Sequence, residues 1–538
     1  MKSVMNHLFS QIPRANIQRS VFDRSSGYKT TFDAGYLVPF FCDEVLPGDT
    51  FELKTSLFAR LATPAVPFMD NLFLETQFFF VPNRLVWSNW QKFCGEQEDP
   101  GDSTDYLVPT IEAPEGGFAV GSIFDYFGIP TGIAGIEINA LPFRAYNLIY
   151  NEWYRDENLQ NSLDVEKGDG PDTYSKYALK RRGKRHDYFT SALPWPQKGA
   201  GVELPLGETA PVILGDSYHS DGTWRNSTAK GYHAMIGAIS LTQTGKTTPL
   251  VPFDPDHSVV YENSSIDGLT PMYADLSSAT AATINSLRTA FQIQRLLERD
   301  ARGGTRYTEL LRSHFGVISP DARLQRPEYL GGSSTRININ PVAQTSSTDA
   351  TTPQANLAAI GVAGDTFHGF SKSFTEHGYI IGLVNVRADL NYQQGLNRMW
   401  SRQTRWDFYW PALAHLGEQA VLNKEIYAQG PAVVDDDGDA VDEKVFGYQE
   451  RFAEYRYRPS IITGKFRSTY AQSLDVWHLA QKFDSLPTLS AEWIEDNPPI
   501  SRVIAVQDEP QFLLDSYFKL RCTRPMPLYG VPGLIDHF

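Results

Sequence analysis

The densest group of basic side chains in the sequence lies at residues 180–186, KRRGKRH. The candidate ligand-binding cations of this basic block are Arg181, Arg182, Lys184 and Arg185. An aromatic pair, Tyr188 and Phe189, follows it. Cationic groups bind phosphates and aromatic rings stack on bases, so the pattern is typical of contact with a single-stranded nucleic acid. The alternative is a solvated charged face.

The amino-terminal segment, residues 1–35, is a second basic element. From residue 1 to residue 30 it has five Lys or Arg residues and one acid, Asp23. We expect an extended arm in which Arg14 and Arg19 contact a polyanion or a neighbouring subunit. The alternative is a frayed terminus.

Sequence patterns that would support catalysis or metal binding are incomplete. Residues 245–247, GKT, resemble the end of a phosphate-binding loop, but Ser240 stands where the first glycine is required. The acidic run 435–439 resembles a calcium loop, but Ala440 and Phe446 replace its turn glycine and terminal glutamate. The eleven histidines include no H-E-x-x-H pair. We therefore predict no enzyme, no cofactor and no metal site, and interpret the acidic run as a solvated hairpin tip.

The composition limits the class of protein. The 538 residues have a net charge of −15, which argues against a polyanion-binding surface over the whole protein and leaves room for a local basic patch. Aromatic residues make up 13%, with 34 prolines and 41 glycines, which favours many short strands and turns. Three cysteines without metal-ligand spacing indicate a reducing cytoplasm. No apolar run is long enough for a membrane span.

The chain is organised around the stretch 71–90, NLFLETQFFFVPNRLVWSNW. Alternate residues from Leu72 to Phe80 fall on one face of a strand, and Phe79 and Val81 fall on the other. Both faces are apolar, so we expect a core strand that ends at Pro82 and is followed by a short helix.

Similar patterns predict the other elements. We expect strands at 36–41, 50–58, 379–390, 500–506 and 512–522. We expect helices that begin at Pro142, near Ile284 and near Val476, and a short one capped by Ser122; Gly303 and Gly304 would end the helix that begins near Ile284. Residues 379–390 change phase as at a bulge. Residues 305–352 read as polar connections with short strand signals. The sequence therefore predicts one β-sandwich closed by its first and last segments.

Residues 197–271 differ from the rest of the chain, being rich in Gly, Ser, Thr and Pro and having more acids than bases. We expect a surface excursion that contains short strands, because an unstructured loop of this length is uncommon in a compact domain. A disordered linker is the alternative.

Several blocks resemble known proteins. They are FFFVPNRLVW at 78–87, RRGKRHDYFTSALPWPQKG at 181–199, the long run 284–332 and INPVAQTS at 339–346. In order and composition they are similar to the major capsid proteins of gokushoviruses, which are Microviridae, small single-stranded DNA phages.

This resemblance implies a mainly β protein, an eight-stranded antiparallel jelly-roll β-sandwich with large loop and helix insertions. Residues 1–35 would be the basic arm, 36–196 and 272–538 the two parts of the capsid domain, and 197–271 a variable insertion that protrudes at the three-fold axes. The function implied is self-assembly into a small T=1 icosahedral shell around circular single-stranded DNA. Such a virion protein is assembled in the host bacterial cytoplasm.

The resemblance also implies partners: further copies of the chain, the viral DNA, a small basic DNA-binding virion protein, an internal scaffolding protein, a pilot protein and a host-surface receptor. In the insertion, the candidate host-contact residues are Tyr218, Trp224 and Tyr232. From the residues alone one rival stays open, a β-rich carbohydrate-active or glycan-binding protein, because paired catalytic carboxylates are a spatial feature.

Overall fold

The computed structural model describes residues 18–202, 284–318, 320, 325–346, 348 and 353–529, together with four short strands at 212–214, 217–218, 224–225 and 272–274. The chain divides into two compact units. Unit 1 comprises Met1–Lys198 and Arg299–Phe538, and unit 2 comprises Gly199–Glu298.

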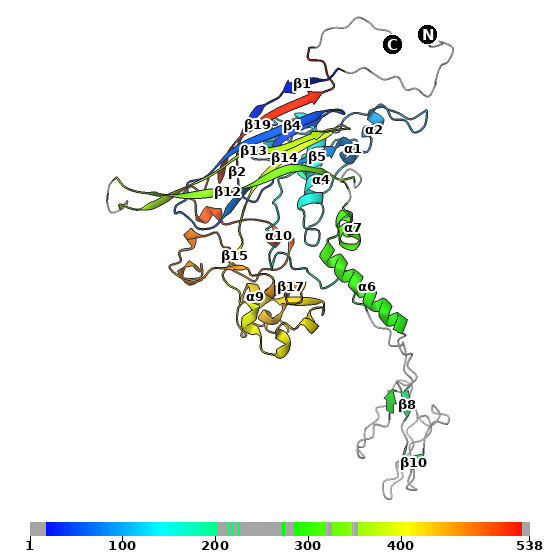
Figure 1. Ribbon diagram of the computed structural model, residues 1–538, viewed down its shortest axis with the longest axis vertical. Helices are drawn as coiled ribbons and strands as arrows, with labels where there is room; N and C mark the ends of the chain where they lie inside the picture. The colour runs from blue at the N-terminus through cyan, green and yellow to red at the C-terminus, as the bar shows by residue number, and fades with distance from the viewer. Residues whose placement is uncertain are drawn as a thin grey trace. The chain divides into compact units, whose positions relative to one another are not determined.

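In the described part of unit 1, nine strands form one antiparallel sheet (Figure 1). They are β1 (Ser20–Asp23), β2 (Ser26–Phe32), β3 (Val38–Val45), β4 (Thr50–Leu61), β5 (Leu72–Pro82), β12 (Glu328–Ala343), β13 (Leu357–Ser373), β14 (Gly378–Ala388) and β19 (Phe512–Arg524). The order is β1-β19-β4-β13-β12-β5-β14-β3, and β2 also pairs with β19. The predicted mainly β, antiparallel fold is confirmed.

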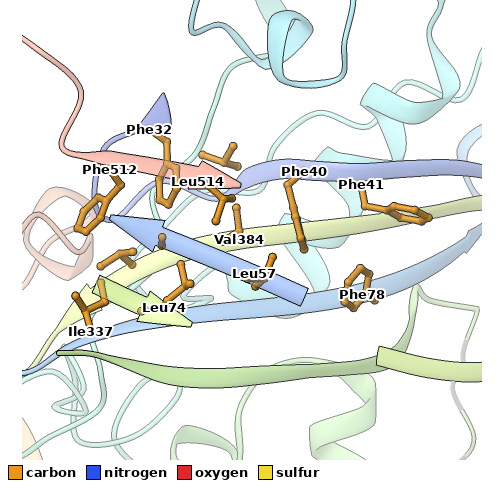
Figure 2. Close-up of a cluster of buried hydrophobic side chains, with 14 of the residues drawn as sticks. Phe32, Phe40, Phe41, Leu57, Leu74, Phe78, Ile337, Val384, Phe512 and Leu514 are labelled. Atoms are coloured by element: carbon orange, nitrogen blue, oxygen red, sulfur yellow. The ribbon is translucent and has the colours of Figure 1, made fainter. Parts of the chain in front are cut away.

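The sheet folds over so that its two halves face each other. Strand β12 pairs with β5 as far as Ile337 and then with β13, and β13 continues along β4, so these two strands pass from one half to the other. Rings on β3 and β5 contact rings on β19 and β13: Phe40 and Phe518 have centroids 5.4 Å apart, and Phe78 and Phe370 5.7 Å apart. Figure 2 shows Phe40 and Phe78 among the apolar side chains that lie between the strands. This is the core of a jelly-roll sandwich.

Strand β5 is buried on both faces, as its pattern predicted. Leu72, Leu74, Phe78 and Phe80 belong to the inner core. Phe79 and Val81 belong to a second cluster on the outer face, which also contains residues of α3 (Ile123–Tyr126) and α4 (Leu141–Ile149). The side chain of Ser122 caps α3 by accepting a hydrogen bond from the Asp125 N–H, as predicted.

The remaining elements are helices and short strand pairs outside the nine-stranded sheet. After β5 come two one-turn helices, α1 (Asn83–Val86) and α2 (Trp90–Phe93), and α4 continues into a π-helix, η1 (Tyr150–Tyr154). Helices α6 (Ile284–Gly303) and α7 (Tyr307–Phe315) precede β12. Short paired strands are β6 (Thr110–Glu112) with β7 (Glu137–Asn139), β15 (Asn391–Tyr392) with β18 (Ser460–Ile461), and β16 (Glu418–Leu422) with β17 (Val445–Glu450). Helices α9 (Asn423–Ile426) and α10 (Ala491–Ile494) complete a third apolar cluster.

Unit 2 contains two short antiparallel pairs among its described residues. Strand β8 (Val212–Leu214) pairs with β11 (Met272–Ala274), and β9 (Ser217–Tyr218) pairs with β10 (Trp224–Arg225). No helix in the described ranges is both long and apolar enough to cross a membrane.

Two predicted elements are wrong. The apolar spacing of residues 476–483 does not form a helix, because only the 3-10 turn η10 (Asp475–Trp477) is present. There the Leu479 N–H donates to the Asp70 carboxylate, and the carbonyls of His478 and Ala480 accept from Arg502. The expected strand at 500–506 contains a 3-10 turn, η11 (Ile500–Arg502). A buried loop whose backbone N–H and C=O groups hydrogen-bond to side chains can have the same apolar spacing as a helix or strand.

Other predictions are confirmed, and two strands are longer than expected. The phase change in β14 is a register shift at Gly382 and Leu383, and α6 ends at Gly303 as predicted. The polar connections expected between residues 305 and 352 contain all of α7 and all of β12, and β13 had no sequence prediction. These strands carry many Gly, Ser, Asn and Ala residues, so their apolar alternation is weak.

Candidate nucleic-acid interface

The basic block runs as an extended segment between two other parts of the chain. The Leu37 N–H donates to the Lys180 carbonyl, and the Arg182 N–H donates to the Gly35 carbonyl. On its other side, the Lys184 N–H donates to the Ile494 carbonyl. An extended backbone directs successive side chains to opposite sides, which separates the contacts of Arg181 from those of Arg182.

Glu75 on β5 is the centre of an ion cluster. Its carboxylate accepts from Arg182, from Arg185 at 2.8 Å and from Arg387 on β14 at 2.8 Å. Its side chain is 8% exposed, and the side chains of Arg182 and Arg387 are 14% and 13% exposed. Residues from β5, β14 and the basic block therefore meet at one buried carboxylate.

The charges of this cluster determine its protonation. Burial by itself would raise the pKa of Glu75, but Arg182, Arg387 and Arg185 outweigh that effect and lower it. Burial and the neighbouring Arg182 lower the pKa of Arg387. One carboxylate therefore holds three guanidinium groups, and the cluster keeps an excess of positive charge.

Two buried titratable groups are Lys184 of the basic block and Asp496. Lys184 donates to the Trp493 carbonyl, and its ammonium lies 4.6 Å from the centre of the Trp493 ring. Burial lowers the pKa of Lys184 to about 8, although Asp496 and Asp187 favour the charged form. Burial raises the pKa of Asp496 to about 7, and Arg387 and Lys184 oppose that rise. Near neutral pH both groups are thus close to their titration points.

The ion cluster forms one wall of a cleft with a volume of about 1180 Å³. Its lining includes eight Arg or Lys side chains and four Asp or Glu side chains. Four aromatic residues also line it: Phe79, Trp153, Tyr154 and Tyr329. A chain with a net charge of −15 therefore has a cleft in which cations outnumber acids.

Another part of the cleft lining is formed around α7. Arg306 pairs with Glu157 and Glu309 and donates to the carbonyls of Asn151 and Arg155, which joins the start of α7 to η1. Gly304 precedes it with φ +87°, where a Cβ atom would overlap the Glu309 carboxylate. Arg312, one turn further along α7, is exposed, and its guanidinium has no described ion-pair partner.

The sequence-predicted cations do not all lie in this cleft. Arg182, Lys184 and Arg185 line it. Arg181 instead stacks on Tyr36, 4.1 Å from the ring centre, and donates to the carbonyls of Ala34 and Asp496. Arg19 donates to the Gly48 carbonyl at 2.6 Å. Arg14 lies outside the described residues.

The predicted aromatic pair has a different role from the one expected. Tyr188 and Phe189 are 3% and 4% exposed and belong to the third apolar cluster, so they are not available for stacking on a base. The rings that line the cleft come from η1, β5 and β12 instead. Of the candidate host-contact residues, Tyr218 and Trp224 are register partners in the β9 and β10 pair, and Tyr232 lies outside the described residues.

Sequence reasoning missed Glu75, Arg387 and the α7 lining. Glu75 is one of three consecutive polar residues in an otherwise apolar strand, and only pairing with β14 brings Arg387 next to it. A signal was present for the α7 lining, because the sequence from 295 to 312 contains five arginines: Arg295, Arg299, Arg302, Arg306 and Arg312. Three of them, Arg302, Arg306 and Arg312, line the cleft.

The acidic run has a cationic partner within the chain. The Lys444 ammonium lies 2.7 Å from the Asp435 carboxylate and 3.0 Å from that of Asp439. A bridge between Val434 and Ala440 closes the loop as a hairpin tip. Within the described ranges, no group of three or more His, Cys, Asp or Glu side chains is arranged to hold a metal ion.

We predict that Glu75→Gln lowers the free energy of unfolding by about 3 to 5 kcal/mol, because it leaves the largely buried guanidinium groups of Arg182 and Arg387 without their carboxylate partner. Denaturant unfolding of the unassembled chain measures the change. The matched control is Glu376→Gln, which breaks the more exposed pair with Arg84 and should cost at most about 1 kcal/mol. Equal costs for the two variants would contradict this role of Glu75.

The substitution Asp496→Asn tests the raised pKa of this buried carboxyl through the pH dependence of stability. The folded-state pKa of Asp496, about 7, lies above that of an unfolded aspartate, so the folded state binds the extra proton between about pH 4 and 7. The stabilisation that this proton gives the wild type is full below that range and is lost as the pH rises to 7. The free energy of unfolding of the variant, relative to that of the wild type, should therefore rise by up to about 4 kcal/mol from about pH 4 to pH 7. Denaturant unfolding at several pH values measures it. A difference that does not change with pH would exclude the raised pKa.

Comparison with known proteins identifies the family of this chain. A family model described as capsid protein (F protein) matches residues 10–534. The chain is 52% identical to capsid protein VP1 of Bdellovibrio phage phiMH2K, with 99% of this chain and 98% of that protein covered, and 48% identical to VP1 of Chlamydia phage 1, with 99% and 98% covered. It is 38% identical to VP1 of Spiroplasma virus 4, with 98% and 97% covered. The chain therefore belongs to the Microviridae phage capsid protein family, a family of structural virion proteins and not of enzymes.

Proposed function

We propose that copies of this chain form a closed T=1 icosahedral shell around circular single-stranded DNA, and that the cleft binds that DNA. The observation that carries the proposal is the surplus of cations in a cleft with aromatic lining, on a chain that is acidic overall. Phosphates need cations and exposed bases need rings, and the cleft offers both.

Not every cation in the cleft is equally available. Arg182 and Arg387 are bound to Glu75, and Arg306 is bound to Glu157. These side chains supply a positive field from fixed positions. Arg312 and His186 are exposed, so they are the groups best placed to reach a phosphate directly. Tyr329, which is 43% exposed, is the accessible ring of the aromatic cluster.

Several cations of the basic block make contacts within the protein, so substituting them would not test DNA binding alone. Arg181 and Lys184 hold backbone carbonyls, and Arg185 contacts Glu75 and Asp389. Neutralising these residues would unfold or distort the block, and a loss of DNA would then have two causes. A clean test of binding uses a cation without such partners.

The overall charge indicates how packaging is completed. A chain of net charge −15 neutralises little DNA by itself, so most neutralisation falls to counterions and to a separate small basic virion protein. Arg14 and Arg19 in the amino-terminal arm would add local contacts. An internal scaffolding protein and a pilot protein complete the partners that we propose for assembly in the host bacterial cytoplasm.

The insertion is the proposed host-attachment element, with Tyr218, Trp224 and Tyr232 as candidate contacts to a surface receptor. Support comes from the division of the chain, since unit 2 contains most of residues 197–271 and unit 1 contains the sheet. A separate unit tolerates sequence change without disturbing the core, which suits a surface adapted to different hosts.

Arg312→Gln should weaken binding of a single-stranded oligonucleotide and lower the salt slope of log K by about 0.7, the value for one lost phosphate contact. The matched control is Arg60→Gln, which removes an exposed arginine on β4 outside the cleft lining. Titration at several salt concentrations measures both variants. Equal slopes for wild type and Arg312→Gln would exclude a phosphate contact at this residue.

A chain shortened between residues 203 and 271 should still assemble but should lose adsorption to host cells, because unit 1 keeps its sheet. Electron microscopy of the particles gives shell size and symmetry, and an adsorption assay gives attachment. Shells of unchanged size that adsorb like wild type would contradict the proposed role of the insertion.

A further inference from the structure

Strands β12 and β13 extend beyond the rest of the sheet as a hairpin (Figure 1). We call residues 338–346 and 353–362 the distal hairpin. Its strands pair with each other from Asn338 with Val362 to Ala343 with Leu357. The Gln344 N–H also donates to the Asn356 carbonyl at 2.9 Å. The paired backbone therefore continues well past the last contact with β5, at Ile337.

Both outer edges of the distal hairpin are open in the described structure. Residues 338–343 of β12 pair with β13 only, and residues 357–360 of β13 pair with β12 only. Open strand edges present unpaired N–H and C=O groups to any neighbour. Proteins that stay monomeric usually protect such edges with charged residues or a covering element.

One face of the distal hairpin is apolar and the other is mixed. Cross-strand partners share a face, so Ile339, Pro341, Ala343, Leu357 and Ala359 lie on one side. Val342, Ala358, Ile360 and Val362 lie on the other side with two exposed amides, Asn338 and Asn340. Val342 is 49% exposed, Ile360 39% and Leu357 38%. The first face continues outward from the core, since Ile337 is buried in it and Ile339 packs against it.

The distal hairpin has almost no charge. Between Arg336 and Asp365 the only charged residue of the sequence is Asp349. DNA is therefore an unsuitable partner, because binding it requires lysines or arginines. A partner that covers this element must offer an apolar surface and backbone groups.

The base of the hairpin fixes its direction. At Gly361 a Cβ atom would lie 2.8 Å from the Leu61 side chain and 3.0 Å from that of Ile339, so the strands pack closely there. Ala359 and Ala363 are buried at this base. The hairpin is thus already ordered in the isolated chain, which lowers the entropy cost of docking.

We propose that the distal hairpin is an assembly arm that docks on a second copy of this chain. The inference rests on the shell proposed above, in which each copy lies against others. A second copy offers suitable surface: Trp400 and Trp406 are 71% and 61% exposed, and Trp410 is 44% exposed. Aromatic surface is enriched at protein interfaces, and a contact between two different surfaces is the kind that closes a ring.

Photo-crosslinking in purified particles tests the partner. Ile360 is replaced by p-benzoylphenylalanine, and the particles are irradiated and analysed on a denaturing gel. We expect a covalent dimer of this chain, identified by mass spectrometry, from intact particles and not from dissociated subunits at equal concentration. A cross-link to another protein, or no cross-link in intact particles, would overturn the proposal.

A charge substitution gives the second measurement. Val342→Lys with Ile360→Lys should leave the melting temperature of the unassembled chain unchanged, because both side chains are exposed, and should reduce assembly roughly tenfold or more. Leu107→Lys, at a residue 83% exposed outside the hairpin, gives the baseline for an added charge. Assembly equal to that baseline would overturn the proposal. Wild-type chain that forms no shell would overturn the proposed function as well, whereas wild-type shells without the dimer would overturn this inference alone.

Discussion

The contact between aromatic rings from the two halves of the sheet is the interaction on which the rest of the structure depends. Phe78 on β5 lies 5.7 Å from Phe370 on β13, and Phe80 lies 4.6 Å from Phe374, between ring centres. Each buried ring contributes roughly 1.5 to 3 kcal/mol, so the sandwich is held by many such contacts and by no disulfide among its three free cysteines. The strands that carry the cleft residues Glu75 and Arg387 belong to this same sheet.

Strand β5 connects this core to the charged cleft. Its inner face carries Phe78 and its outer face carries Phe79, while Glu75 accepts from the basic block and from β14. A buried ion cluster contributes less to stability than apolar packing of the same volume, but it fixes the positions of the groups that it joins. The cleft therefore has arginines whose locations are set by the same strand that fills the core. This coupling gives an acidic protein a cleft in which cations outnumber acids.

The structure separates three kinds of surface on one chain. The cleft is cationic, the distal hairpin is apolar and nearly uncharged, and the insertion forms most of a second compact unit. In the function proposed above, these surfaces contact DNA, other copies of the chain and a host, and the three contacts place different demands on charge. Keeping them on different segments lets each change without weakening the others.

The sequence by itself determined the elements whose signals are local. The alternation from Leu72 to Phe80, the Ser122 cap and the glycine end of α6 were readable because hydrogen bonds and side-chain direction repeat over a few residues. The basic block was also readable as a concentration of charge. Only the tertiary structure decided what that charge does: pairing of β5 with β14 places Arg387 at Glu75, and packing buries Tyr188 and Phe189 while Tyr329 lines the cleft. Such neighbours lie hundreds of residues apart, and no local pattern specifies which distant strands will pair.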